Sequence, residues 1–261
     1  MLSYQHIFHA GNLADVHKHA LLACALTYMT QKPKPMSYLE THSGRGVYHL
    51  DSAEAVKTGE AKAGIEAVAG WFTEDHPYAK AMAAIKVQFG KTVYPGSPAI
   101  AASILRTGDT LHLAELHPRE NDALQDAMVM SGAKTYLQDG FGMAHAVCPP
   151  TPRRGMLLID PSYEIKGDYT TIPTFVSKLH RKWNVGTIAL WYPILTDDSH
   201  KRMLSALEAQ ALPKTLRHEV RFPPAREGHR MVGSGMFFVN VPFGLDTECA
   251  RLGERFLSLS K

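Results

Sequence analysis

The sequence Met156-Leu157-Leu158-Ile159-Asp160-Pro161-Ser162-Tyr163 joins an apolar run to a carboxylate, a proline and an aromatic ring. Its first four residues are typical of a buried strand in a parallel sheet. The four residues that follow therefore come at the carboxyl edge of that sheet, where open α/β sheets bind their ligands. This stretch predicts an α/β fold with a functional site at residues 160–163.

The four residues Asp160-Pro161-Ser162-Tyr163 carry a particular set of chemical groups. The Asp160 carboxylate and the Pro161 carbonyl can accept the two hydrogen bonds of an exocyclic amine on a base. The Tyr163 ring can stack on that flat base. An enzyme that methylates such an amine needs these groups, but Asp-Pro is also frequent in turns, so the motif depends on its context.

Predicted strands and helices alternate along most of the chain. Strands are expected over residues 37–41, 110–116, 134–137, 156–159, 187–192, 216–222 and 236–241. Helices are expected over residues 16–29, 99–106, 120–130, 172–183 and 199–210. The alternation predicts one domain, residues 1–261, built on a mostly parallel sheet with helices on both faces. The last two strands have no clear helix between them, which leaves an antiparallel orientation open for one of them.

Residues 47–93 differ in composition from the rest of the chain. They are rich in Ala, Lys and Glu, their apolar residues have helical spacing, and no strand is expected among them. We therefore expect a helical insertion in the α/β core. Nearer the N-terminus, Asp15 is expected to cap the helix that starts at about residue 16.

Composition and charge limit the classes of protein to which this chain can belong. Hydrophobic residues make up 45% and charged residues 20% of the 261, which is ordinary for a soluble globular protein. A net charge of +3 permits a local basic face for nucleic acid without requiring one. The three cysteines are far apart, which argues against a disulfide framework or a zinc site and fits a reducing cytoplasm. No apolar run approaches a membrane span, so we expect a cytoplasmic protein that binds no membrane. A monomer is the default expectation, because the sequence has no obvious interface stripe.

Three further candidate positions follow predicted strands. The loop His42-Ser43-Gly44-Arg45-Gly46 can let a ligand approach the backbone, although most such glycine turns are only turns. Glu115 can accept from both hydroxyls of a ribose, and a solvent-facing carboxylate explains it equally well. Asp139-Gly140 can accept from an adenine amino group, and Asp-Gly is also a common turn. Their shared place at strand ends adds weight to the motif at residues 160–163.

Several short motifs, each unspecific by itself, occur together in this chain. They are Leu2-Ser3-Tyr4, Phe8-His9-Ala10-Gly11-Asn12, Ala14-Asp15-Val16, Lys18-His19, Thr41-His42-x-Gly44-x-Gly46, Tyr94-Pro95-Gly96-Ser97-Pro98, Glu115-Leu116-His117-Pro118, Asp139-Gly140-Phe141, Arg153-Arg154-Gly155, Leu158-Ile159-Asp160-Pro161, Leu190-Trp191-Tyr192-Pro193 and Ser234-Gly235-Met236. In combination they resemble the RlmJ family of bacterial 23S ribosomal RNA adenine-N6 methyltransferases. The resemblance extends from Met1 to about Pro242, nearly the whole chain.

The resemblance implies a class I S-adenosylmethionine-dependent methyltransferase fold, a Rossmann-like, mostly parallel seven-stranded sheet with a helical insertion. It implies 23S rRNA as the partner, S-adenosylmethionine as the methyl donor, S-adenosylhomocysteine as the product, and no metal. By the resemblance, Asp160 is the catalytic acceptor, with Pro161 and Tyr163 beside it. Tyr4 would contact the RNA from an N-terminal tail, residues 1–20, that closes over the cofactor. The implied cofactor-binding residues are Lys18, His19, His42, Ser97, Glu115, Asp139, Gly140 and Asp160.

One residue departs from the family pattern, and two other functions stay open. The family usually has Asp-Pro-Pro-Tyr, and here Ser162 replaces the second proline. Both acceptors remain, but the loop loses the rigidity of a fixed φ angle. A DNA adenine-N6 methyltransferase uses the same four-residue chemistry, and a non-catalytic RNA-binding or ribosome-assembly module could keep the fold. A protein glutamine methyltransferase fits less well, because that chemistry usually has Asn at the position of Asp160.

Overall fold

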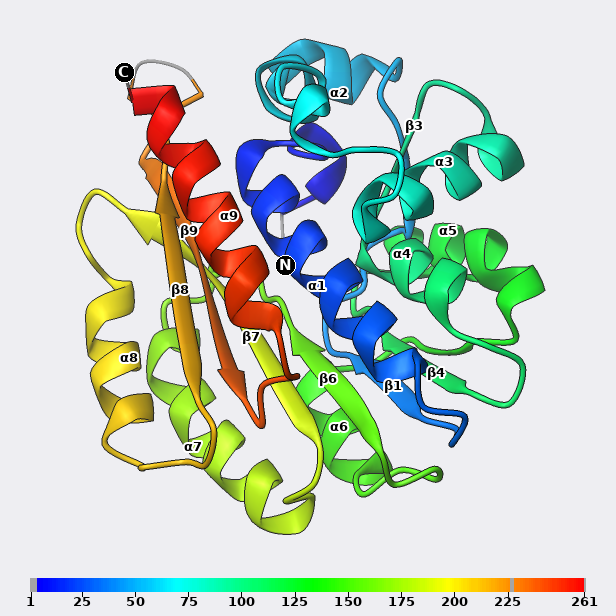
Figure 1. The fold of residues 1–261 in the computed structure, drawn as a ribbon, viewed down its shortest axis with the longest axis vertical. Coiled ribbons are helices and arrows are strands. Elements are labelled where there is room, and N and C mark those ends of the chain that lie inside the picture. The colour runs from blue at the N-terminus through cyan, green and yellow to red at the C-terminus, as the bar shows by residue number, and fades with distance from the viewer. Residues whose placement is uncertain (1–3, 226–227, 261) are drawn as a thin grey trace.

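A computed structural model describes residues 4–225 and 228–260. A seven-stranded sheet with the order β5-β4-β1-β6-β7-β9-β8 forms its centre (Figure 1). The strands are β1 (Ser37–Glu40), β4 (Thr110–Ala114), β5 (Lys134–Tyr136), β6 (Gly155–Ile159), β7 (Thr187–Leu195), β8 (Leu216–Arg221) and β9 (Met231–Val239). Of these seven strands, only β9 runs in the direction opposite to the other six. The expected mostly parallel sheet with one reversed strand is confirmed.

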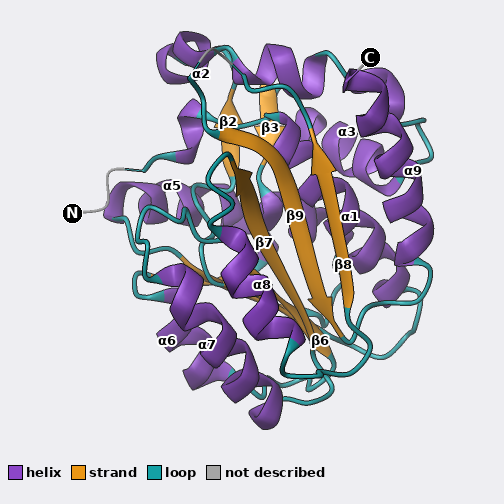
Figure 2. Ribbon diagram, turned by 90° about the vertical axis from the view of Figure 1, so that its left-hand side faces the viewer, coloured by secondary structure: helices purple, strands orange, loops and turns teal. Residues whose placement is uncertain are grey.

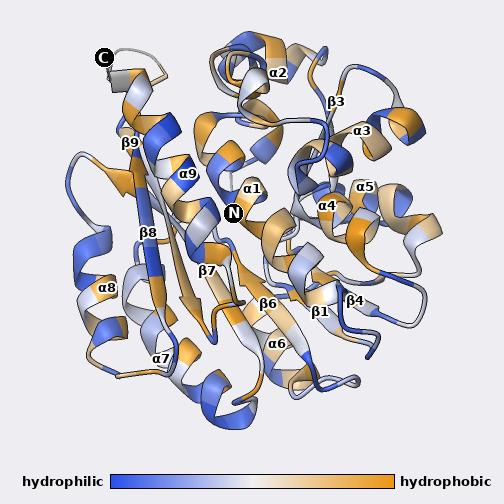
Figure 3. Cartoon of the chain, viewed as in Figure 1, coloured by the Kyte–Doolittle hydropathy of each residue, from blue (hydrophilic) through white to orange (hydrophobic). Residues whose placement is uncertain are grey.

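Helices cover both faces of this sheet (Figures 1 and 2). One face carries α1 (Leu13–Thr30), α4 (Ser97–Ile104), α5 (Pro118–Met128) and α9 (Leu245–Leu257). The other carries α6 (Gly140–Val147), α7 (Asp168–Lys182) and α8 (His200–Glu208). Because both faces are covered, the central strand β6 is almost entirely apolar, whereas the edge strand β8 is largely hydrophilic (Figure 3).

The central strand β1 shows why the strand ends form one site. Ser37 at its start pairs with Thr110 of β4 on one side and with Gly155 of β6 on the other. All four residues of β1 are buried. Parallel strands in this register end together, so the loops that follow β1, β4 and β6 meet at one edge of the sheet.

Helix α1 begins three residues before the predicted start. Asn12 is its N-cap, because the Asn12 side chain accepts a hydrogen bond of 2.9 Å from the backbone N–H of Asp15. The expectation that Asp15 caps the helix is therefore wrong. Asp15 lies inside the first turn and is buried, which leaves its carboxylate free to bind other side chains.

The segment from residue 47 to 93 contains helices but also short strands, contrary to the expectation that it has none. β2 (Val47–His49) pairs antiparallel with β3 (Val93–Pro95), so the two ends of the segment meet. Between them lie α2 (Ala53–Thr58), a π-helical turn (Lys62–Glu66), a 3₁₀ turn (Ala69–Trp71) and α3 (Pro77–Phe89). The strands were missed because three residues are too few for a periodic pattern. That this segment is a separate insertion stays a prediction.

Two helices were not expected from the sequence. α6 begins with Gly-Phe-Gly, and glycine lowers helix propensity. α9 has a readable apolar stripe at Leu245, Cys249, Leu252 and Phe256, all of them buried, and this spacing could have predicted the helix. In the part of the chain that the structure describes, no helix has the length and apolar character needed to cross a bilayer.

Candidate active site

A cavity of about 780 Å³ lies at the carboxyl ends of the parallel strands. Every site residue predicted from the sequence lines it: Tyr4, Lys18, His19, His42, Ser97, Glu115, Asp139, Gly140, Asp160, Pro161 and Tyr163. These residues come from the N-terminal segment, from α1, from the start of α4 and from the loops at the ends of β1, β4, β5 and β6. The fold thus brings together positions that are up to 159 residues apart in the sequence.

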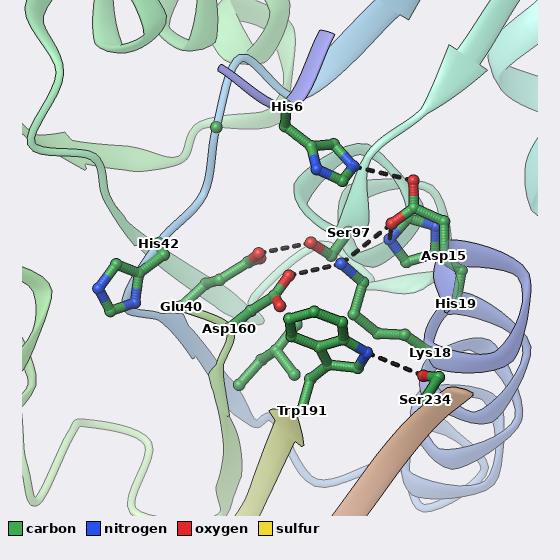
Figure 4. A network of polar contacts seen from close by, with 12 residues as sticks. His6, Asp15, Lys18, His19, Glu40, His42, Ser97, Asp160, Trp191 and Ser234 are labelled. Carbon is green, nitrogen blue, oxygen red and sulfur yellow. Dashed lines mark hydrogen bonds and ion pairs between the residues drawn. The ribbon is translucent and has the colours of Figure 1, made fainter. Parts of the chain in front are cut away.

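Asp160 binds a buried lysine at the base of this cavity (Figure 4). The Lys18 ammonium lies 2.5 Å from Asp160 Oδ2 and 3.1 Å from Asp15 Oδ1. Only 4% of Lys18 is exposed. Burial alone would lower the pKa of Lys18, but its ion pairs with Asp160 and Asp15 raise it above its ordinary value. Lys18 is therefore charged, and it occupies one oxygen of the Asp160 carboxylate.

The network continues from Asp15 to the N-terminal segment. His6 Nε2 lies 2.8 Å from Asp15 Oδ2, and the Tyr4 hydroxyl lies 2.7 Å from His6 Nδ1. Burial alone would raise the pKa of Asp15, but the charges of His6 and Lys18 hold it well below its ordinary value. The backbone N–H of Tyr4 also donates to Glu164 Oε2 at 3.3 Å. These contacts place Tyr4 over the loop that follows β6, at the mouth of the cavity.

Glu115 is held at the end of β4 by two backbone donors. Its Oε2 accepts from Gly44 N–H and its Oε1 from His117 N–H, each at 2.8 Å. Burial raises the pKa of this carboxyl. Each oxygen keeps a second lone pair that can accept from a ligand. Gly44 has φ +57°, and a Cβ there would overlap the Tyr48 hydroxyl, so this close approach requires glycine.

His42 and Asp139 line the other end of the cavity. His42 Nδ1 bonds the Thr41 hydroxyl at 2.8 Å, and its ring packs edge-on against Phe141 with centroids 5.3 Å apart. Burial lowers the pKa of His42 to about 4, so the ring is neutral near pH 7. Asp139 caps α6, because its Oδ2 accepts from Gly142 N–H at 2.7 Å. Asp139-Gly140 is therefore a helix start.

Glu40 was missed by the sequence analysis, although it ends β1 as Glu115 follows β4. Its buried carboxyl accepts from the Ser97 hydroxyl at 2.5 Å and from the Tyr38 hydroxyl at 2.8 Å. Burial raises the pKa of Glu40 to about 8. This contact holds the Ser97 hydroxyl in place on the cavity wall. A carboxylate at the end of the first core strand was the available signal.

Trp191 of β7 is a second residue that the sequence analysis left without a role. Its backbone carbonyl accepts a 2.7 Å hydrogen bond from the Tyr163 hydroxyl, which fixes that ring. The Lys18 ammonium lies 5.4 Å from the centroid of the indole ring, within cation–π distance. The indole N–H donates to Ser234 Oγ at 2.9 Å (Figure 4). Ser234 in turn bonds His17 Nδ1 at 2.8 Å. Trp191 thus supports both Tyr163 and Lys18.

Comparison with known proteins identifies the family. The model described as "Ribosomal RNA large subunit methyltransferase D, RlmJ" matches residues 33–258. The chain is 40% identical, over 255 residues, to "Ribosomal RNA large subunit methyltransferase J" of Escherichia coli, covering 95% of this chain and 90% of that protein. The chain belongs to the RlmJ family. The resemblance expected from the motifs is confirmed.

One further relative and one solved structure support the assignment to the RlmJ family. A Haemophilus influenzae protein of the same name is 40% identical over 257 residues, covering 95% of this chain and 90% of that protein. A crystal structure of a Legionella pneumophila protein superposes with a TM-score of 0.85 at 33% identity, covering 96% of this chain and 94% of that one. The fold of this RlmJ family member is the class I methyltransferase fold, as expected.

The cavity fits the methyl donor that membership of the RlmJ family implies. Its volume of about 780 Å³ is within the range of small-molecule and cofactor sites. Carboxylates at Glu115 and Asp139 offer acceptors for a ribose and an adenine amino group. His19 is buried, and its Nε2 has no hydrogen-bond partner among the described residues, although its Nδ1 bonds the Tyr94 hydroxyl at 2.8 Å. Burial lowers the pKa of His19 to about 3, so the ring is neutral.

A cluster of Cys24, His76 and Glu248 has the residue types of a metal site, with ligand atoms within 4.8 Å of one another. Its hydrogen bonds favour another explanation. His76 Nδ1 accepts from Tyr78 N–H, so the neutral ring carries its proton on Nε2, which lies 3.2 Å from Glu248 Oε1. Arg251 binds both oxygens of Glu248 at 2.7 Å. A nitrogen that donates and a carboxylate already paired with a guanidinium make poor metal ligands.

Proposed function

We propose that this protein transfers the methyl group of S-adenosylmethionine to the N6 amine of an adenine in 23S rRNA. The observation that carries the proposal is the Asp160 carboxylate at the base of the cavity. Lys18 occupies one of its oxygens, and no described residue bonds the other. Pro161 lines the same cavity, so a carboxylate oxygen and a carbonyl stand together at the carboxyl end of β6.

The chemistry follows from the electronic state of the adenine N6 amine. Its lone pair is delocalised into the ring, so the free amine is a poor nucleophile. Hydrogen bonds from the amine to Asp160 Oδ1 and to the Pro161 carbonyl favour a tetrahedral nitrogen and release that lone pair. When bound, S-adenosylmethionine supplies a methyl group on a positively charged sulfur. N6 must lose one proton when it gains the methyl group, and Asp160 both disperses the positive charge that develops on N6 and can take that proton.

Lys18 and Tyr163 prepare Asp160 and the target base. Lys18 orients the Asp160 carboxylate through an ion pair, and that ion pair offsets part of the cost of burying the negative charge. Tyr163 is only 8% exposed, and its hydroxyl donates to the Trp191 carbonyl, which holds the ring in place. We infer that the flipped adenine stacks on its accessible part. A single-stranded or bulged segment is the easier substrate, because less unstacking is required.

The remaining predicted residues have places around the cofactor. Glu115 would hold the ribose hydroxyls with the second lone pairs of its oxygens. Asp139, whose Oδ2 caps α6, would accept from the adenine amino group with Oδ1. Ser97, which Glu40 holds on the cavity wall, would contact the methionine part. We place this reaction in the cytoplasm and assign it to a monomer.

The test is substitution of Asp160, with S-adenosylhomocysteine binding as the second readout. Asp160→Ala removes the acceptor, and we expect methyl transfer to undermodified 23S rRNA to fall below detection. Asp160→Asn keeps a hydrogen-bond acceptor for Lys18 and separates loss of chemistry from loss of folding. Both variants should still bind S-adenosylhomocysteine in calorimetry.

Asp246→Ala is the matched control, because Asp246 is exposed on α9 and does not line the cavity. It should retain the wild-type rate. Near-normal turnover by Asp160→Ala would refute the assignment of the catalytic acceptor. Failure of the wild-type protein to bind S-adenosylhomocysteine would favour the non-catalytic, RNA-binding alternative.

A further inference from the structure

The N-terminal segment 4–12 is docked on the helical segment 58–65. The Thr58 hydroxyl donates to the Phe8 carbonyl at 2.5 Å, and Ile65 N–H donates to the Gly11 carbonyl at 2.8 Å. A Cβ at Gly64 would overlap the Gly11 carbonyl, so the two backbones are in direct contact. The 3₁₀ turn His6–Phe8 of the N-terminal segment also contacts α2.

Glu60 is the charged residue of this contact. It is only 5% exposed. Its Oε1 lies 2.9 Å from His9 Nδ1, and its Oε2 accepts from Asn12 Nδ2 at 3.1 Å. Burial alone would raise the pKa of Glu60, but its bonds to His9 and Asn12 lower it below the ordinary value. One buried carboxylate therefore holds two residues of the N-terminal segment at once.

Asn12 connects Glu60 to the catalytic centre through helix α1. While Asn12 Nδ2 donates to Glu60, Asn12 Oδ1 accepts from Asp15 N–H and caps the helix. Asp15 binds Lys18, and Lys18 binds Asp160. The Asn12 amide thus uses its nitrogen for Glu60 and its oxygen for the first turn of α1. A change in the Asn12 rotamer would therefore remove the cap from the turn that contains Asp15.

His9 provides a second connection. Its ring stacks on Tyr4 with centroids 5.5 Å apart and planes 7° from parallel. The Tyr4 hydroxyl bonds His6, and His6 bonds Asp15. Both connections from Glu60 thus end on Asp15, the residue that shares Lys18 with Asp160.

We propose that Glu60 is a positioning residue, which holds the N-terminal segment against segment 58–65 and thereby keeps Asp15 and Lys18 where they orient Asp160. Its own carboxylate has no part in the chemistry. The proposal rests on the function proposed above, in which Asp160 accepts from the substrate amine. It extends the catalytic machinery to a residue in the predicted insertion.

The test compares Glu60→Ala and Glu60→Gln with a control, Glu54→Ala. Glu54 is an exposed carboxylate in the first turn of α2. Glu60→Ala should lower kcat on 23S rRNA by about tenfold or more, since small misplacements of reacting groups have effects of this size. Glu60→Gln should recover most of that loss, because the amide can accept from Asn12 and donate to His9. Glu54→Ala should match the wild type.

Hydrogen exchange of the N-terminal segment is the readout that does not depend on activity. In Glu60→Ala, the amides of Gly11 and Asp15, which bond Asp15 Oδ2 and Asn12 Oδ1, should exchange at least several-fold faster. The amides of β6 should exchange as in the wild type, which shows that the variant is folded. Faster exchange with slower turnover, and recovery of both in Glu60→Gln, would support the proposal.

Two results would overturn it. In the first, Glu60→Ala has the exchange and the kcat of Glu54→Ala. In the second, only one of these two quantities changes, so that the segment and the chemistry are not coupled. A wild-type protein that does not methylate rRNA would refute the proposed function instead, while the exchange data would still decide whether Glu60 anchors the segment.

Discussion

Asp160 can serve a substrate because its neighbours use only one of its oxygens. Lys18 bonds Asp160 Oδ2 and Asp15 Oδ1, and the second oxygen of Asp15 is taken by His6 and by Gly11 N–H. Among the described residues, Asp160 Oδ1 therefore stays available. Breaking a buried ion pair by removing one partner costs about 3–5 kcal/mol. Substitutions in this network must consequently be measured for stability as well as for activity.

Glu40 gives a prediction about pH at the residue scale. Burial raises its pKa from 4.5 to about 8, so the folded protein retains a proton that the unfolded chain releases in this range. The contribution of Glu40 to stability should therefore be complete below about pH 4.5 and be lost as the pH rises toward about 8. Each pKa unit corresponds to about 1.4 kcal/mol. Urea unfolding of the wild type and of Glu40→Gln across this range measures the effect.

The difference between the two proteins isolates Glu40 from the other titrating groups. Glutamine resembles the neutral carboxyl, so Glu40→Gln should lack this part of the pH dependence. The difference in unfolding free energy, variant minus wild type, should therefore increase by a few kcal/mol as the pH rises. Parallel pH profiles would show that Glu40 titrates at its ordinary pKa.

At the scale of elements, the cavity depends on how closely α6 approaches β1. Gly140 is the first residue of α6, and a Cβ there would overlap the Thr41 carbonyl at the end of β1. The helix can start at this place only because Gly140 has no side chain. The same approach sets Asp139 and His42 on the cavity wall, since Asp139 precedes the helix and His42 follows the strand.

Gly140→Ala tests this dependence. The added methyl group must push α6 away from β1, so we expect the dissociation constant for S-adenosylhomocysteine to rise at least tenfold, about 1.4 kcal/mol or more. Calorimetry measures this change. Gly70→Ala is the control, because no atom lies within 4 Å of a Cβ at Gly70. Equal affinity in Gly140→Ala and the wild type would mean that α6 does not shape the cofactor site.

At the scale of the whole molecule, the protein has little overall charge with which to attract nucleic acid. Its net charge is only +3, so non-specific affinity for phosphate backbones should be modest. The motif at residues 160–163 cannot discriminate between RNA and DNA, because both present the same adenine amine. Under the proposed function, recognition of the substrate must therefore come from surfaces around the cavity and from the ease of flipping the base.

Transfer of labelled methyl groups to different nucleic acids tests the substrate at this scale. We expect incorporation into undermodified 23S rRNA at least tenfold above that into duplex DNA, with the label recovered as N6-methyladenine. The rate should fall as salt increases, since phosphate contacts release counterions. A higher rate on duplex DNA would instead identify a DNA adenine-N6 methyltransferase.

Much of the fold could be predicted because apolar runs and helical spacing are local properties. The strand at residues 156–159 and the alternation around it indicated the sheet and its functional edge. Short or glycine-rich elements could not be predicted in this way. Pairing and close packing with residues distant in the sequence stabilise β2, β3 and α6. No local sequence pattern predicts such contacts. The capping of α1 by Asn12 was missed because Asn12 and Asp15 are both good caps.

The sequence alone determined the chemical groups at residues 160–163 and their place at the end of a buried strand, because strand periodicity and residue chemistry can be read locally. Only the tertiary structure decided how those groups are used. It placed Lys18 on Asp160, Trp191 under Lys18, and Glu60 on the cap of α1. Contacts between residues that are 142 or 48 positions apart depend on how elements pack in three dimensions. No spacing along the chain encodes them.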